Sequence, residues 1–363
     1  MLGKHFTFTH PVAGYSFALF EALNKSGQFL LLLDGFDEMK YYLTTAAFRY
    51  TFKEILKLVR PKSKAILAGR QTAFLSSAER DEFLRATRTH EGRSVSIAGR
   101  VSFRELTLAP FSRGDGELFI ERYRRHLDFM STREGYRSDL PPEQDFFVTP
   151  NLEEIARRPL HLEMLFEVLP LYGGNLDEMT VRKLYDLFVQ CMLERETEKA
   201  ARSQFDLSAR KRFLEGLSFF MWAKGAATVE ISDIPDFCFN VNLAGGRFSD
   251  EIKRDLIGGS FVEMRLSGRL LFPHRSIQEY FVAEFLASFF LGSQYASHLA
   301  LDINIILDFG FIDSHVSPEV LDFLVARGQT IQKAAFDALR GYPRAISSKS
   351  IRYLCREVSF CSL

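Results

Sequence analysis

An apolar run that ends directly in a cluster of acids constrains this chain more than any other feature. Residues 29–33 read Phe-Leu-Leu-Leu-Leu, and residues 34–38 read Asp-Gly-Phe-Asp-Glu. A short unbroken apolar run is typical of a strand covered on both faces, as in a parallel sheet flanked by helices. Such sheets bind ligands at the carboxyl ends of their strands. We therefore expect Asp34 at that edge, with Gly35 allowing a sharp turn that brings Asp37 and Glu38 beside it.

Three neighbouring carboxylates indicate a cation site. Crowded carboxylates repel one another unless a cation such as Mg²⁺ neutralises them. In phosphoryl-transfer sites one acid holds Mg²⁺ and another orients the attacking water. The alternative interpretation is a strand that ends in a solvated acidic turn.

Two further short apolar runs extend the predicted sheet. They lie at residues 65–68 and 106–108, and residues 44–59 between the first two runs have helical spacing. This order predicts a β-α-β unit with a right-handed crossover.

The sheet pattern stops after Pro110, and helical patterns follow. Ser112 with Asp115 three residues later predicts a capping box that opens a helix. Further helices are predicted at 152–169, 181–200, 208–224 and 274–290, short strands at 227–231, 261–266 and 270–272, and a helical tail at 301–363.

Composition excludes several classes of protein. The 46 basic and 46 acidic side chains give a net charge of zero, which weighs against nucleic acid or an anionic membrane as the main partner. No apolar stretch reaches the length of about 18 residues that a membrane span needs. The four cysteines form neither a CxxC pair nor a zinc spacing with histidine, which predicts a cytoplasmic protein with reduced thiols.

The string from Leu30 to Glu38 resembles the Walker B segment of NACHT nucleoside triphosphatases, which belong to the signal-transducing ATPases with numerous domains (STAND). The resemblance extends over roughly residues 23–291. It implies binding of ATP or ADP, or of GTP, with Mg²⁺. It also implies that Asp34 ligates the metal, and that Asp37 and Glu38 lie near the attacking water as the catalytic acids.

Three further strings resemble motifs of the same family, in the expected order. The run 65–70 ends in Arg70, like the sensor strand whose arginine reaches the terminal phosphate. Arg158-Pro159-Leu160 is similar to the proline motif, which places Pro159 beside the adenine. The string 272–281 resembles the winged-helix motif, whose histidine, here His274, contacts the ADP β-phosphate. The alternatives are a surface salt bridge for Arg70, a favoured first-turn position for Pro159, and a helix cap for His274.

The resemblance departs from the family at the phosphate-binding loop. No GxxxxGK[ST] occurs in the sequence, and that loop supplies the amides and the lysine that cradle the phosphates. In the family, the strand that precedes this loop lies in the sheet between the sensor strand and the last strand. Without it, the strands predicted here at 65–68 and 106–108 would each expose an unpaired edge. We therefore expect the chain to be the C-terminal part of a longer protein, or the product of a truncated gene or a misassigned start. Alone, it is expected to bind ATP weakly or not at all.

The predicted fold is a partial α/β sheet of the P-loop NTPase class, followed by an all-helical domain, a winged-helix domain and a short helical tail. The expected boundaries are 1–110, 111–200, 201–291 and 292–363. The function implied is a nucleotide-controlled signalling switch that self-oligomerises in its full-length form in answer to an unknown trigger. The alternatives are a nucleotide-free interaction module derived from such a protein, and a winged-helix DNA-binding protein, which the neutral charge disfavours.

Overall fold

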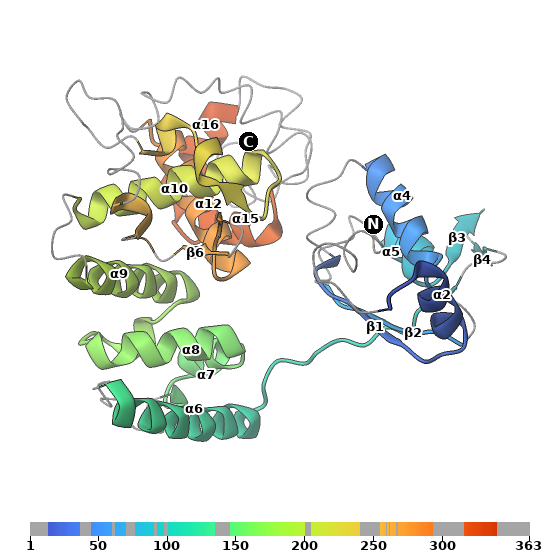
Figure 1. Ribbon diagram of the computed structural model, residues 1–363. Coiled ribbons are helices and arrows are strands. Elements are labelled where there is room, and N and C mark those ends of the chain that lie inside the picture. The colour runs from blue at the N-terminus through green and yellow to red at the C-terminus, as the bar shows by residue number, and fades with distance from the viewer. Residues whose placement is uncertain are drawn as a thin grey trace. The chain divides into compact units, whose positions relative to one another are not determined.

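The computed structural model is mostly helical among the residues that it describes, with a few short strands in small sheets. The described residues are 14–36, 45–59, 62–69, 77–90, 93–97, 101–134, 146–199, 205–239, 255–258, 260, 262–265, 268–292 and 316–339. The chain divides into two compact units, residues 1–107 and residues 108–363 (Figure 1). We call them the N-terminal unit and the C-terminal unit.

The N-terminal unit combines a parallel strand pair with helices and a hairpin. Its elements are α2 (Phe17–Lys25), β1 (Leu30–Leu33), α4 (Thr45–Leu56), β2 (Lys64–Leu67), α5 (Ser77–Leu84), β3 (Thr87–His90) and β4 (Arg93–Ser96). Strands β1 and β2 are parallel, with Leu30 opposite Lys64 and Leu33 opposite Leu67. The two predicted strands and the helix between them are therefore confirmed. The antiparallel hairpin of β3 and β4 was not predicted.

Phenylalanine rings form the core of the N-terminal unit. Phe48 and Phe52 of α4 pack against Phe83 of α5, with ring centroids 5.3 and 4.9 Å apart. Phe36, three residues after the end of β1, joins them at 5.3 Å from Phe48. These side chains are buried and cover one side of the strand pair, together with Leu67.

Two expectations about the sheet are wrong. Residues 106–108 form no strand, and Leu106 and Leu108 are 82% and 96% exposed. The physical reason is the lack of a partner, because within the described residues β1 pairs with β2 and no strand lies beside 106–108. Within the described residues the strand pair is also covered on one face only, since Leu32 and Ile66 are 68% and 54% exposed.

The C-terminal unit is built from stacked helices. Its helices are α6 (Arg113–Glu134), α7 (Pro150–Ala156), α8 (Pro159–Val168), α9 (Val181–Lys199), α10 (Leu207–Ala223), α12 (Arg275–Phe290), α15 (Pro318–Val325) and α16 (Gln329–Leu339). Short 3₁₀ turns lie at Leu169–Leu171, Leu176–Glu178, Ile231–Asp233 and Asp236–Phe239. Helix α8 packs on α9, α9 on α10, and α10 on α12, which also contacts α15 and α16 (Figure 1).

Local sequence signals set where these helices begin. The predicted capping box is confirmed at the start of α6: the Ser112 N–H donates to the Asp115 carboxylate at 3.0 Å, and the Asp115 N–H donates to Ser112 Oγ at 3.2 Å. The helix predicted over 152–169 is broken into α7 and α8. Proline disfavours helical backbone in the residue before it, and Arg158 accordingly takes an extended conformation with φ −106° and ψ 123°.

A small antiparallel sheet lies between α10 and α12 in the sequence. It has the order β5 (Val229–Glu230), β7 (Arg269–Leu271), β6 (Glu263–Met264), which confirms the three predicted strands. The guanidinium of Arg269 contacts the Glu230 carboxylate at 2.7 Å across this sheet. The hydrophobic core of the unit joins side chains from all of its larger helices. None of the described helices combines the length and the apolar character that crossing a membrane requires.

Candidate functional site

Asp34 lies where the sequence predicts it, directly after β1. Its side chain is exposed, and its Oδ1 accepts a hydrogen bond from the Gly35 N–H at 2.8 Å. Gly35 has a φ of 73°, a left-handed conformation that glycine adopts without a steric penalty. The turn is held to the end of β2, because the Phe36 N–H donates to the Ala68 carbonyl at 3.1 Å. The carboxylate therefore stands at the carboxyl edge of the parallel pair.

The other predicted residues of this edge, Asp37, Glu38 and Arg70, lie outside the described residues. The described part of the chain contains no group of three or more His, Cys, Asp or Glu side chains that could hold a metal ion. By itself Asp34 provides one exposed carboxylate, of which Gly35 holds one oxygen. Magnesium commonly takes one or two carboxylates and completes its shell with water and phosphate oxygens.

Pro159 and His274 lie in the C-terminal unit, each at the start of a helix. Pro159 is exposed and is the first residue of α8, where the missing proline N–H costs no hydrogen bond. Arg158 precedes it and makes no side-chain cap. His274 is exposed and is the N-cap of α12, with extended backbone at φ −145° and ψ 141°. Its ring Nδ1 accepts a hydrogen bond from the Ser276 N–H at 3.1 Å.

His161, in the first turn of α8, is a buried histidine close to both predicted residues. It is 4% exposed, and in the part of the chain that the structure describes its Nδ1 has no hydrogen-bond partner. Burial, with smaller electrostatic contributions from Arg158 and His274, lowers the pKa of the His161 imidazole to about 4. The ring is therefore neutral at physiological pH.

Tyr185 of α9 joins the beginnings of α8 and α12. Its hydroxyl contacts Ser276 Oγ at 2.7 Å, and its ring lies edge-on to His161 with centroids 5.7 Å apart. The side chain is 1% exposed. The structure therefore brings the helix that starts at Pro159 and the helix capped by His274 together around one buried tyrosine. Helix N-termini attract anions because their N–H groups lack partners within the helix.

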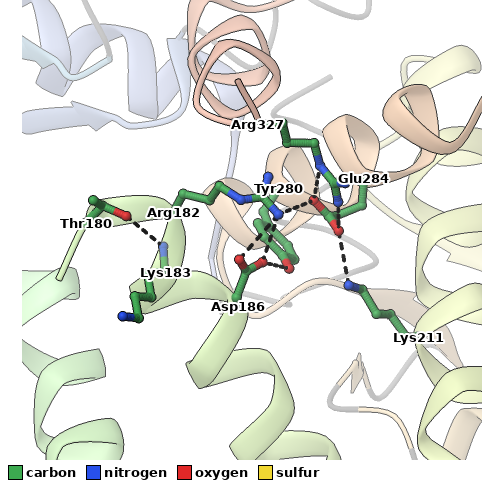
Figure 2. A network of polar contacts seen from close by, with 8 residues as sticks. All are labelled: Thr180, Arg182, Lys183, Asp186, Lys211, Tyr280, Glu284 and Arg327. Atoms are coloured by element: carbon green, nitrogen blue, oxygen red, sulfur yellow. Dashed lines mark hydrogen bonds and ion pairs between the residues drawn. The ribbon is translucent and has the colours of Figure 1, made fainter. Parts of the chain in front are cut away.

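A network of charges around one buried carboxylate lies farther along α9 and α12 (Figure 2). Glu284 of α12 is its centre, with 3% of the side chain exposed. Lys211 Nζ of α10 lies 3.0 Å from this carboxylate, Arg182 of α9 lies 3.4 Å away, and Arg327 Nε, between α15 and α16, lies 2.9 Å away. One carboxylate therefore connects segments that are far apart in the sequence.

A second part of this network connects α9 and α12 through Asp186. The Tyr280 hydroxyl donates to the Asp186 carboxylate at 2.6 Å, and Arg182 lies 3.3 Å from the same carboxylate (Figure 2). Burial raises the pKa of the Tyr280 phenol far above its usual range, and the charges of Glu284 and Asp186 add to this rise. Tyr280 therefore stays protonated and acts as the donor.

Two neighbouring glutamates respond to burial in opposite ways. Burial disfavours ionisation of Glu284, but Lys211, Arg327 and Arg182 outweigh it and leave the pKa of Glu284 lowered. Glu215 of α10 is also buried, and burial, opposed by the charge of Lys211 and supported by that of Glu284, raises its pKa to about 7. Glu284 therefore carries the charge that the surrounding cations neutralise, while Glu215 is protonated below pH 7.

Sequence reasoning missed His161, Tyr185 and Ser276. Each of His161 and Ser276 lies two residues from a predicted site residue, and Ser276 lies within the string 272–281, but neither position gave a sign of its role. Glu284 did carry a signal, because it interrupts the most apolar tract of the chain. A charge inside such a tract points to a buried ion pair, since an isolated buried charge is too costly.

Comparison with known proteins adds one relative. No family model matches the chain. Over 283 residues the chain is 26% identical to a protein of Nostoc sp. strain PCC 7120 that is described as an uncharacterized WD repeat-containing protein. The match covers 77% of this chain, which spans 17% of the length of that relative.

Proposed function

We propose that the chain is part of a nucleotide-controlled signalling switch of the NACHT and STAND type. In this proposal ADP favours a closed form, and ATP favours an open form that self-oligomerises in the cytoplasm when an unidentified trigger binds. Oligomerisation would then carry a signal, for example in innate or antiphage defence. The proposal involves neither nucleic acid nor a membrane.

The meeting of α8 and α12 around Tyr185 is the observation that supports this proposal most strongly. Pro159 and His274 are more than a hundred residues apart in the sequence, yet each begins a helix that contacts the same buried ring. A nucleotide site needs an apolar surface for the base and hydrogen-bond donors for the phosphates. The exposed Pro159 would supply the first, and His274 with the N–H groups of the helix ends would supply the second.

In the N-terminal unit, considered by itself, Asp34 is the candidate metal ligand. Its exposed carboxylate at the edge of the parallel pair would hold Mg²⁺, which supplies neutralisation of phosphate charge. Asp37 and Glu38 follow it within the same acidic string and would orient the attacking water. Arg70 follows the end of β2 by three residues and would reach the terminal phosphate.

A nucleotide-free interaction module is the second candidate. The absence of GxxxxGK[ST] from the sequence favours it, because that loop provides much of the affinity for phosphates. The open face of the parallel pair favours it as well, since Leu30, Leu32 and Ile66 are each more than half exposed. Parallel sheets are normally covered on both faces.

Protection of the chain by nucleotide against thermal unfolding separates the two candidates. Without the phosphate loop we expect affinity in the millimolar range, and ADP at about ten times its dissociation constant stabilises by about 1.4 kcal/mol. His274→Ala removes a hydrogen bond to a charged group, which is worth about 1.5–3 kcal/mol. It should therefore abolish the protection by Mg-ADP at the same concentration.

Two control variants make this measurement specific. Asp34→Ala should reduce the part of the protection that depends on Mg²⁺, whereas Asp233→Ala, at another exposed aspartate, should not. His126→Ala replaces an exposed histidine of α6 and should leave protection unchanged. If millimolar Mg-ADP and Mg-ATP leave the melting temperature of the wild-type chain unchanged, the interaction module replaces the switch as the better description.

A further inference from the structure

The direction of one hydrogen bond fixes the tautomer of His274. The Ser276 N–H can only donate, and it donates to His274 Nδ1 at 3.1 Å. Nδ1 is therefore an acceptor, and the neutral ring carries its proton on Nε2. In this state the His274 ring carries its N–H on the side opposite to the helix cap.

The same reasoning orders two hydroxyl groups behind His274. Ser276 Oγ lies 2.7 Å from the same Nδ1. With Nδ1 as the acceptor, the Ser276 O–H donates to its single lone pair and shares it with the Ser276 N–H in a three-centre hydrogen bond. Because this donation uses the only proton of Ser276 Oγ, the oxygen accepts from the hydroxyl of Tyr185, 2.7 Å away. Both distances are typical of well-formed hydrogen bonds. The result is a directed relay from Tyr185 through Ser276 to His274.

Helix α15 packs on the first member of this relay. Phe323 of α15 lies edge-on to the Tyr185 ring, with centroids 4.9 Å apart, and Tyr280 stacks on that ring at 5.7 Å. Tyr185 and Phe323 are 1% and 8% exposed. Side chains in such close-packed surroundings keep one rotamer, so the position of the Tyr185 hydroxyl depends on the docking of α15.

We propose that Tyr185 is a positioning residue that fixes the orientation and tautomer of His274 through Ser276, and that α15 controls this relay by packing on the Tyr185 ring. With α15 docked, His274 presents its Nε2–H in one position. With α15 displaced, Tyr185 loses one wall of its site and His274 loses the support of the hydroxyl groups. The consequence for nucleotide control rests on the proposed function, whereas the relay itself does not.

A purely structural role for Tyr185 makes a different prediction. The backbone bond from Ser276 caps α12 whether or not the two hydroxyls take part. If Tyr185 only fills space, its hydroxyl is dispensable, and its removal leaves the ring of His274 as it was. The electronic state of His274 Nδ1 therefore distinguishes positioning from packing.

The experiment follows the ring nitrogens of His274 by NMR in the full chain labelled with ¹⁵N-histidine. The His274 signals are identified by their loss in His274→Gln. Ser276→Ala removes the hydroxyl but keeps the backbone cap. Its spectrum therefore gives the chemical shift of a Nδ1 that accepts no hydrogen bond from a hydroxyl group. Tyr185→Phe removes the first donor of the relay and keeps the ring.

Tyr280→Phe is the matched control. Its ring stacks on that of Tyr185, but its hydroxyl donates to Asp186 at 2.6 Å and lies outside the relay. We expect the Nδ1 signal of Tyr185→Phe to lie between those of the wild type and Ser276→Ala, and that of Tyr280→Phe to coincide with the wild type. A Tyr185→Phe signal at the wild-type position, or an equal shift in Tyr280→Phe, would overturn the relay.

Phe323→Leu tests control by α15. We expect its Nδ1 signal to move in the direction that Tyr185→Phe defines, and a signal at the wild-type position would overturn control by α15. Protection by Mg-ADP is then measured on the same variants, and we expect it to fall in Tyr185→Phe and to persist in Tyr280→Phe. If the spectra change as expected but the wild type shows no protection at all, the proposed function fails and the relay stands.

Discussion

Glu284→Gln is the substitution that should weaken the C-terminal unit most through electrostatics. Glutamine keeps the size of the side chain and removes its charge. The wild-type carboxylate is 3% exposed and lies 3.0 Å from Lys211 Nζ, 3.4 Å from Arg182 and 2.9 Å from Arg327 Nε. After the substitution these three cations share no buried anion, and among the described residues only Arg182 keeps a carboxylate partner, Asp186 at 3.3 Å.

The surroundings of Glu284 set the magnitude. Removing one partner of a buried ion pair costs about 3–5 kcal/mol. The side chains of the three cations are 18–37% exposed, so water can partly replace the lost anion. We therefore expect a loss near the lower limit, about 3 kcal/mol. For a unit of this size that corresponds to a fall in melting temperature of roughly 6–12 °C.

Urea unfolding followed by circular dichroism measures this loss, with Glu117→Gln as the control. Glu117 pairs with Arg113 at 3.1 Å, but both side chains are more than half exposed. An exposed pair of this kind contributes at most about 1 kcal/mol. If Glu284→Gln lowers the free energy of unfolding no more than Glu117→Gln does, the buried network does not hold the helices together and our reasoning about it is wrong.

Two further predictions concern pH. Burial raises the pKa of Glu215 from 4.5 to about 7, so the folded state keeps a proton that the unfolded state releases near pH 4.5. The contribution of this group to stability is therefore complete below pH 4.5 and is lost as the pH rises through 7. Glu215→Gln should therefore raise the free energy of unfolding at pH 8 by about 3 kcal/mol relative to its effect at pH 4.5, and equal effects at the two pH values would refute this. Because the pKa of His161 is lowered from 6.5 to about 4, its contribution is present above pH 6.5 and is lost as pH falls towards 4. In His161→Phe, melting temperature measured against pH should fall less steeply over that range, and a slope equal to that of the wild type would contradict a neutral buried imidazole.

Elements with a strong local signal could be predicted from the sequence. The apolar runs gave β1 and β2, and the reciprocal Ser112 and Asp115 contacts gave the start of α6. The strand predicted at 106–108 failed because a strand needs a neighbour, and no local pattern reports whether one is present. The break at Pro159 could have been predicted, because proline restricts the residue before it.

Candidate site residues could be predicted only where a continuous stretch of sequence contains the whole motif. Asp34 at the end of β1, Pro159 at the start of α8 and His274 at the start of α12 all lie where their strings place them. The connections between these strings could not be predicted. Tyr185 and Ser276 are 91 residues apart, and their hydrogen bond exists only because α9 and α12 pack together. Contacts between distant segments depend on tertiary packing, which leaves no periodic trace in either segment.

Titration of the full chain with Mg-ADP, followed through the ring signals of ¹⁵N-labelled histidine, tests the proposed nucleotide switch most directly. Each of the eight histidines of the chain gives its own ring signals, and these report on the surroundings of that residue. The account predicts saturable shifts of the His274 and His161 signals at millimolar Mg-ADP, with His126 on α6 unaffected. Unchanged His274 and His161 signals at saturating nucleotide, or shifts of equal size at His126, would contradict a nucleotide site at the beginnings of α8 and α12.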